Sequence, residues 1–287
     1  MYTTLISADQ LAALQDHPQS VMVFDCSFEL MQPEAGDLQY QDIHLAGAVR
    51  ADLDRHLSAP KGARDRASGG RHPLPSREAF ANWLGSVGFD SSMQAVVYDR
   101  QGAVYAGRLW WMLKWVGHEA VAVLDGGLQA WQAQGGAVAS GQDAPARAPA
   151  RFAVAPALAR LSSTEQVEQL LGRPTQTLLD ARAEPRFRGE VEPLDPIAGH
   201  IPGALNRPFG FNFGADGKFK SAAVLRQEFD ALLAGHDPAS VVHHCGSGVS
   251  AVPNLIAMEL AGLGRSALYA GSWSEWCSDP SRPMAQG

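Results

Sequence analysis

The sequence predicts an α/β protein of two similar domains, each a parallel sheet flanked by helices. Three observations support this fold class. Short runs rich in Val and Leu alternate with stretches of helical spacing, which is typical of parallel sheets covered by helices. The same order of elements occurs twice along the chain. The 287 residues, 46% of them hydrophobic, are enough for two cores of ordinary size.

The later part of the repeat has a constant offset. Residues 95–131 align without a gap with residues 240–276, because 240 − 95 and 276 − 131 both equal 145. Each copy reads in order as a helix, a strand ending in Asp, a His-x-x-Gly-Ala turn, a helix, a strand, a loop, an amphipathic helix, a strand and a Gly-containing turn before Trp. Asp25 and Asp180 end the equivalent first strands. In this alignment Arg100 stands where the second copy has Cys245.

A segment rich in Ala and Pro separates the two copies. Residues 140–157 lack any hydrophobic period, so they are interpreted as a linker. The predicted organisation is therefore a non-catalytic domain at 1–139, a linker at 140–157 and a catalytic domain at 158–287.

Composition excludes several classes of protein. The net charge of −7 argues against a surface for nucleic acid or anionic membranes. No apolar run approaches the roughly 20 residues of a membrane span, and no secretory signal is visible. Cys26, Cys245 and Cys277 form neither a CxxC motif nor an even set, so neither a disulfide framework nor a zinc site is expected. A cytoplasmic protein without metal or organic cofactor is expected.

Cys245 lies where a strand beginning at Val241 gives way to a helix predicted to start near Ser250. Ligands of open parallel sheets bind beyond the carboxyl ends of the strands. The small residues Gly246, Ser247 and Gly248 allow a tight curve that directs backbone N–H groups at the sulfur, and the helix N-terminus faces the same spot. These features favour a thiolate nucleophile, or the anionic species that the thiolate becomes.

Two chemistries use a cysteine in such a loop. A cysteine phosphatase needs His-Cys-x5-Arg, whose arginine holds the phosphoryl oxygens. Here the residue six positions beyond Cys245 is Ala251, and the loop carries no cation. Sulfur transfer through a cysteine persulfide is the chemistry that remains.

The tandem repeat, the turn "GHIPGALNRPF" and the loop "CGSGVSA" resemble the rhodanese superfamily of sulfurtransferases. Within it the loop resembles that of the 3-mercaptopyruvate sulfurtransferases, whereas thiosulfate-using rhodaneses typically carry basic residues where Gly246 and Ser247 stand. The resemblance implies sulfur transfer from 3-mercaptopyruvate to cyanide or to a thiol, such as thioredoxin or a small thiol. A thiosulfate:cyanide sulfurtransferase and a non-catalytic persulfide carrier for a protein partner are the alternatives.

The resemblance also implies the substrate-binding residues. Arg186, in "DARAEPRFRG", matches an arginine that pairs with the donor carboxylate. A second family arginine is replaced by Leu194, so Arg188 is the candidate to substitute for it. The loop residues that would bind substrate are Gly246, Ser247, Gly248, Val249 and Ser250.

An Asp-His-Ser set assists proton transfer in the family. By resemblance its members here are Asp54, in "ADLDRHL", His72, in "RHPLP", and Ser247 in the loop. Their expected role is to supply the proton that the enolate needs after it loses sulfur.

Overall fold

The computed structural model describes residues 1–14, 20–142, 144 and 147–287, so part of the predicted linker at 140–157 lies outside the described residues. The chain forms two compact units. The first unit comprises Met1–Asp65, Pro75–Leu158 and Asp216–Lys218. The second comprises Arg66–Leu74, Ala159–Ala215 and Phe219–Gly287. The short segment Arg66–Leu74 therefore packs with the second unit, although the sequence on both sides of it belongs to the first.

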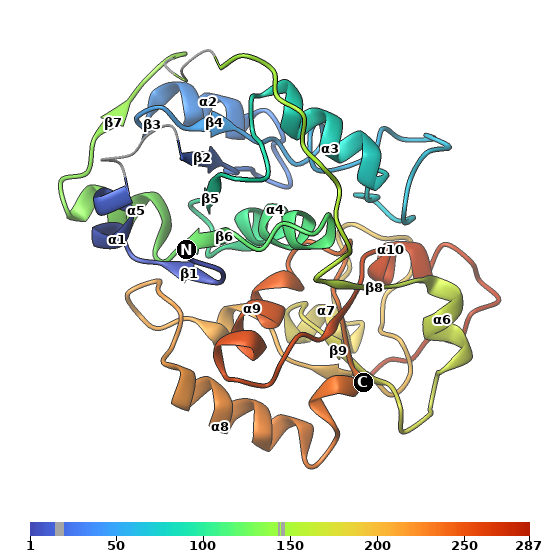
Figure 1. Ribbon diagram of the computed structural model, residues 1–287. Helices are drawn as coiled ribbons and strands as arrows, with labels where there is room; N and C mark the ends of the chain where they lie inside the picture. The colour runs from blue at the N-terminus through green and yellow to red at the C-terminus, as the bar shows by residue number, and fades with distance from the viewer. Residues whose placement is uncertain (15–19, 143, 145–146) are drawn as a thin grey trace. The chain divides into compact units, whose positions relative to one another are not determined.

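The first unit is built on a five-stranded parallel sheet of order β1-β6-β5-β2-β4 (Figure 1). Its strands are β1 (Leu5–Ile6), β2 (Val21–Asp25), β4 (Val49–Arg50), β5 (Gln94–Tyr98) and β6 (Val121–Leu124). Its helices are α1 (Ala8–Leu14), α2 (Ala35–Asp42), α3 (Arg77–Ser86), α4 (Val104–Trp115) and α5 (Gly127–Ala133). A small antiparallel pair joins β3 (His44–Leu45) to β7 (Val138–Ala139).

The second unit has a five-stranded parallel sheet of order β10-β9-β11-β12-β8. Its strands are β8 (Arg160–Ser162), β9 (Thr177–Asp180), β10 (Leu205–Asn206), β11 (Val241–His244) and β12 (Ala267–Tyr269). Its helices are α6 (Thr164–Gln169), α7 (Glu184–Arg188), α8 (Ala222–Leu233), α9 (Val252–Leu260) and α10 (Ser272–Trp276), with 3-10 turns η1 (Phe209–Asn212) and η2 (Pro238–Ser240).

Each strand of the first sheet has a counterpart in the second. In the order β1-β6-β5-β2-β4, the equivalents are β8, β12, β11, β9 and β10, so the two sheets share one topology. The predicted α/β class with two parallel sheets flanked by helices is confirmed. In both units the central strand, β5 or β11, leads into a loop and then a helix that packs on the sheet.

Strand register corrects the sequence alignment at one important point. Val96 of β5 pairs with Ala122, and Val242 of β11 pairs with Ala267, which lies 145 residues beyond Ala122. Val96 and Val242 are therefore equivalent, at an offset of 146. The counterpart of Cys245 is Asp99 and not Arg100.

A second observation agrees with this register. The backbone N–H of Trp273 donates to the carbonyl of Cys245 at 3.0 Å, and that of Leu128, 145 residues earlier, donates to the carbonyl of Asp99 at 3.4 Å. The prediction that Arg100 occupies the position of Cys245 is wrong by one residue, because the connections that follow the two strands differ in length and a gap-free alignment cannot accommodate that difference.

Side-chain alternation on the strands divides the core of the second unit between the two faces of its sheet. Val242 and Leu178 face α6 and α10, where they pack with Trp273 and Trp276. Their chain neighbours Val241 and Leu179 belong to the cluster on the opposite face, which contains α8 and α9. Every residue of β11 is buried. A strand covered on both faces is a rigid support for the loop that follows it.

Helix ends in the second unit are fixed by local side chains. The Ser163 hydroxyl accepts from the Gln166 backbone N–H, and the Ser163 backbone N–H donates to the Gln166 side-chain oxygen. These two bonds make a capping box at the start of α6. Ser221 caps α8 by a single bond, because its side chain accepts from the Val224 N–H. Across the described residues, no helix combines the length and apolar character needed to span a membrane.

Candidate active site

The candidate nucleophile lies at the carboxyl end of the central strand of the second sheet. Cys245 follows β11 directly, and β11 is hydrogen-bonded to β9 on one side and β12 on the other. The side chain is only 1% exposed. This is the position at which open parallel sheets place their ligands.

The first turn of α10 holds the backbone of the cysteine in place. The Cys245 N–H donates to the Ser272 Oγ at 3.1 Å, and the Cys245 carbonyl accepts from the Trp273 N–H at 3.0 Å. Ser272 is fully buried with a φ of +56°, a conformation that non-glycine residues rarely adopt. Its hydroxyl donates to the Tyr269 carbonyl at 2.9 Å, so the strained residue is fixed on both sides. Ser272 is a residue of the site that the sequence did not reveal.

The loop after the cysteine requires glycine at its centre. Gly248 has a φ of +71°, and a Cβ at this position would lie 2.2 Å from the Ala270 carbonyl oxygen. An alanine could be accommodated only by moving the backbone. The predicted tight curve is therefore present, and α9 begins at Val252, two residues later than expected, with Pro253 in its first turn.

Several backbone N–H groups of this loop make no hydrogen bond to another described residue. In the part of the chain that the structure describes, the backbone N–H groups of Gly246, Ser247, Val249 and Ser250 donate to no carbonyl, side-chain oxygen or cysteine sulfur. Amides in a closed loop need an acceptor, since an unpaired buried N–H costs about 1–3 kcal/mol. The bonds to the Cys245 sulfur that the sequence predicts are therefore not formed by these four groups in the described structure.

The first unit shows what the equivalent loop binds. Asp99, the counterpart of Cys245, is buried and places its carboxylate among the amides of its own loop. Its Oδ1 accepts from the N–H groups of Gln101 and Ala103 at 3.0 Å each. Its Oδ2 accepts from those of Tyr105 and Ala106 at 2.8 and 3.0 Å. In the first unit, the connection that follows the central strand therefore directs four backbone N–H groups at one side-chain carboxyl group of the protein.

Ser247 and His72 meet beside the cysteine loop. The Ser247 Oγ lies 2.7 Å from the His72 Nδ1, and both residues are buried. His72 belongs to Arg66–Leu74, which the structure places with the second unit. The Arg71 N–H of that segment donates to the Ser274 Oγ at 3.0 Å, and the Ser274 N–H in turn donates to the Gly246 carbonyl of the cysteine loop at 2.9 Å. The predicted pair is thus brought together across 175 residues of sequence.

Asp54 belongs to the first unit. It is exposed, and its backbone N–H donates to the Asp52 Oδ1 at 3.0 Å. Its place in a set with His72 and Ser247 stays a prediction.

Two guanidinium groups flank the loop. A Cβ built on Gly246 would lie 3.1 Å from the Arg71 Nη2 and 3.5 Å from the Arg186 Nη1. Asp195 joins the two arginines: its Oδ1 lies 2.6 Å from the Arg71 Nη1 and its Oδ2 3.3 Å from the Arg186 Nη2. Glu192 Oε1 also pairs with the Arg186 Nη2, at 2.7 Å. The cluster of two arginines and two acids is formally neutral.

Arg188 has a different environment from Arg186, although both lie on α7. Its guanidinium pairs with Glu184 one turn earlier, and also lies 4.0 Å from Glu190. The side chain is 50% exposed, compared with 19% for Arg186. These are the features of a surface ion pair.

The histidines before the cysteine are uncharged at neutral pH. Burial lowers the pKa of His243 to about 3, and burial also lowers the pKa of His244 despite the neighbouring Asp180. The His243 Nε2 contacts the Met258 sulfur at 3.1 Å, and the His244 Nδ1 lies 3.8 Å from the Asp180 Oδ2. Neither histidine brings positive charge to the cysteine loop.

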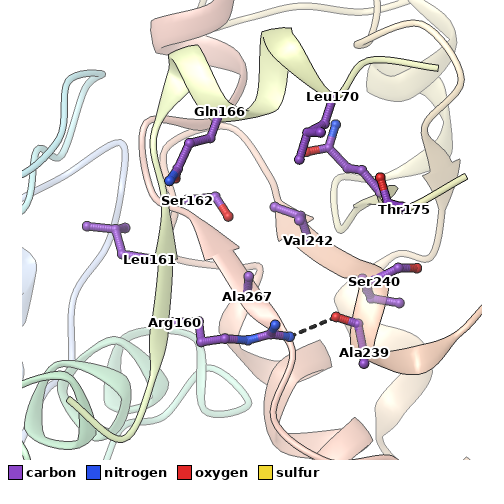
Figure 2. Close-up of a pocket in the computed structure, with 12 residues that line it drawn as sticks. Arg160, Leu161, Ser162, Gln166, Leu170, Thr175, Ala239, Ser240, Val242 and Ala267 are labelled. Carbon is purple, nitrogen blue, oxygen red and sulfur yellow. Dashed lines mark hydrogen bonds between the residues drawn. The ribbon is translucent and has the colours of Figure 1, made fainter. Parts of the chain in front are cut away.

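A pocket of about 260 Å³ lies at the opposite end of the sheet (Figure 2). It is lined by the first residues of three parallel strands, Arg160, Val241 and Ala267, whereas Cys245 follows the carboxyl end of β11. The Arg160 guanidinium donates to the carbonyls of Ala239 and Arg265 at 2.9 and 3.1 Å, and Figure 2 marks the first of these bonds. The pocket is therefore not part of the cysteine site.

Comparison with known proteins identifies the family. The family model described as "Rhodanese-like domain" matches residues 7–134 and again residues 163–279. A Pseudomonas aeruginosa protein named "Probable 3-mercaptopyruvate sulfurtransferase" is 46% identical over 99% of this chain and 98% of its own length. The mouse "Thiosulfate sulfurtransferase" is 33% identical over 93% of this chain and 89% of its own.

A solved structure shares the fold over the whole chain. The 3-mercaptopyruvate sulfurtransferase of Escherichia coli superposes with a TM-score of 0.78 at 30% identity, covering 96% of this chain and all of the other. Together, the two matches to the family model, the full-length relatives and the shared topology of the two units establish that this chain belongs to the rhodanese family of sulfurtransferases.

Proposed function

We propose that this chain transfers sulfur from 3-mercaptopyruvate to a thiol or to cyanide through a persulfide on Cys245. The observation that carries the proposal is the carboxylate of Asp99 in the equivalent loop of the first unit, bound by four backbone N–H groups. Its oxygens are as many bonds from Cα as the outer sulfur of a cysteine persulfide. A persulfide on Cys245 would place its terminal anion where the first unit places a carboxylate.

The backbone N–H groups of the second loop that lack an acceptor support the same proposal. Gly246, Ser247, Val249 and Ser250 offer N–H groups that have no acceptor among the described residues. Hydrogen bonds to a charged acceptor contribute more than those to a neutral one. The loop is thus a preorganised set of donors that stabilises the intermediate as charge reaches the outer sulfur.

The first half-reaction needs no oxidant or reductant. The Cys245 thiolate attacks the sulfur of the donor thiol, and the new S–S bond forms as the donor C–S bond breaks. The electron pair of the C–S bond remains on the donor carbon as the enolate of pyruvate. The proton of the donor thiol leaves the new persulfide, and the enolate carbon takes up a proton. The products are Cys–S–S⁻ and pyruvate.

In the second half-reaction an acceptor takes the outer sulfur. A thiol, from thioredoxin or a small molecule, attacks that sulfur, the S–S bond breaks, and the thiolate of Cys245 is restored together with a persulfide of the acceptor. Cyanide gives thiocyanate by the same displacement. No metal or organic cofactor takes part in either step.

Ser247 and His72 are the proposed proton carriers. Their hydrogen bond of 2.7 Å is buried and involves Ser247, two residues after Cys245 in the same loop. A proton released by the donor thiol passes to this pair and then to the enolate carbon. Asp54 is the proposed third member of the set.

The donor is assigned from the charge of the site. The loop itself carries no cation, and the cluster of Arg71, Arg186, Glu192 and Asp195 is formally neutral. Such a site suits a monoanionic keto-thiol better than a thiosulfate dianion, because a neutral cluster compensates neither charge of the dianion and the cost of burying charge rises with the charge. We assign the Arg186 guanidinium to the donor carboxylate.

A comparison of two sulfur donors tests this assignment. We expect kcat/KM for 3-mercaptopyruvate, with a small thiol as acceptor, to exceed that for thiosulfate with cyanide by at least about tenfold, a difference of roughly 1.4 kcal/mol in transition-state binding. A preference for thiosulfate would overturn the choice of donor but not the persulfide. Failure of both donors, with sulfur accepted only from a protein partner, would indicate a persulfide carrier instead.

A further inference from the structure

We propose that Arg71 is the second guanidinium that binds the donor carboxylate, in the role for which the family resemblance expects an arginine at the position of Leu194. This inference rests on the proposed function, because it concerns the carboxylate of the same donor. It transfers the role from α7 and its following loop to Arg66–Leu74, a segment distant in sequence that packs with the second unit.

Arg71 is fixed by both its backbone and its side chain. Its N–H donates to the Ser274 Oγ at 3.0 Å. The preceding residue, Gly70, has a φ of +82° and packs against the Gly271 carbonyl, which a Cβ would approach to 2.5 Å. The guanidinium is held by Asp195 at 2.6 Å and is 23% exposed. A guanidinium held in this way loses little further freedom when it binds a ligand.

The guanidinium of Arg71 lies next to the reacting cysteine. The position of a Cβ on Gly246, the residue after Cys245, is 3.1 Å from the Arg71 Nη2 and 3.5 Å from the Arg186 Nη1. Because Gly246 has no side chain, no Cβ crowds the two guanidinium groups. A donor whose sulfur meets Cys245 can extend its short carbon chain over Gly246 toward both arginines.

Each of the two arginines has one N–H group that makes no hydrogen bond in the described structure. The Nε atoms of Arg71 and Arg186 are buried and have no hydrogen-bond partner in the described part of the chain. Asp195 occupies the Arg71 Nη1 and the Arg186 Nη2, and Glu192 shares the latter. A carboxylate that accepts from the remaining N–H groups would satisfy donors that the fold leaves unpaired.

The structure favours Arg71 over Arg188 for this role. Arg188 is half exposed and pairs with Glu184 in its own helix. Leu194 contributes only its backbone N–H, which donates to the Glu192 Oε1 at 3.0 Å. With Leu194 apolar and Arg188 engaged at the surface, Arg71 is the cation that accompanies Arg186 at Gly246.

Kinetics with two donors that differ only in the carboxylate test the proposal. The donors are 3-mercaptopyruvate and mercaptoacetone, in which a methyl group replaces the carboxylate. We expect Arg71→Gln to raise KM for mercaptopyruvate about tenfold or more, which corresponds to about 1.4 kcal/mol or more, because the carboxylate loses a charged hydrogen-bond donor. We expect kcat to change little, and kcat/KM for mercaptoacetone to stay within about twofold.

Three further variants give the comparison its controls. Arg226→Gln removes an exposed arginine that pairs with Asp230 on α8, and should change neither donor. Arg188→Gln tests the competing assignment. Arg71→Lys retains the charge and should recover part of the lost affinity for mercaptopyruvate. It should not recover all of it, because a lysine cannot form the bidentate hydrogen bonds of a guanidinium. Thermal unfolding of each variant confirms that it is folded.

Every outcome decides the question. Equal losses with both donors would mean that Arg71 only supports the fold, and a KM increase in Arg188→Gln but not in Arg71→Gln would give the role to Arg188.

If the parent protein does not turn over mercaptopyruvate, the proposed function fails separately, and calorimetric binding of pyruvate then tests Arg71 alone. Weaker pyruvate binding by Arg71→Gln supports the proposal, whereas equal binding, or none by the parent, overturns it.

Discussion

Cys245→Ser lowers the rate of pyruvate release from 3-mercaptopyruvate by about three orders of magnitude or more. A serine hydroxyl is a far weaker nucleophile toward sulfur than a thiolate, and it cannot carry sulfur as a persulfide. The loss therefore falls on kcat, while binding of the donor carboxylate by arginines on other segments is retained. Steady-state kinetics with a small-thiol acceptor measures both constants.

The matched control for this variant is Cys277→Ala. Cys277 is also a free and buried cysteine of the second unit, 2% exposed and packed in the cluster beneath α10. Its replacement should leave the rate within about twofold of the parent, after correction for any loss of folded protein. Parent-like turnover by Cys245→Ser would refute the assignment of the nucleophile.

His72→Ala and Ser247→Ala each lower kcat for mercaptopyruvate by about a hundredfold, with little change in KM. The two side chains share one hydrogen bond of 2.7 Å, so we expect them to act as a unit. The double variant should be no slower than the slower single variant, because removal of either member already interrupts proton transfer.

Exposed residues of the same types supply the controls. His236→Ala and Ser278→Ala remove an imidazole and a hydroxyl from the surface of the second unit and should leave kcat unchanged. Additive losses in the His72 and Ser247 double variant would contradict a shared proton path. An increase in KM alone would reassign the pair to donor binding.

The fold was predictable from sequence because its signals are local and repeated. Continuous apolar strands such as β2 and β9 end in Asp25 and Asp180, and each is followed by the same turn and helix. Because the pattern occurs twice, each weak indication of a strand or helix in one copy is supported by the same indication in the other. The cysteine loop was visible for a related reason, since few residues other than Gly fit the position of Gly248.

The finer arrangement of the site depends on contacts that sequence does not encode locally. The one-residue shift between Asp99 and Arg100 arises where the two copies have connections of different length, and only strand register reveals it. Arg71 stands 174 residues before Cys245, and only the packing of Arg66–Leu74 against α10 brings its guanidinium to the loop. The adjacency of Arg71 to His72 was the single available signal.

The central claim is that the loop after β11 stabilises an anionic outer sulfur on Cys245. Peptide mass spectrometry after a single turnover, with mercaptopyruvate supplied in equimolar amount and no acceptor present, tests it most directly. We predict one added sulfur atom per chain, located on the peptide that contains Cys245, together with one pyruvate released per sulfur bound. Pyruvate released without added sulfur on Cys245, or sulfur found on Cys26 or Cys277 instead, would contradict the account.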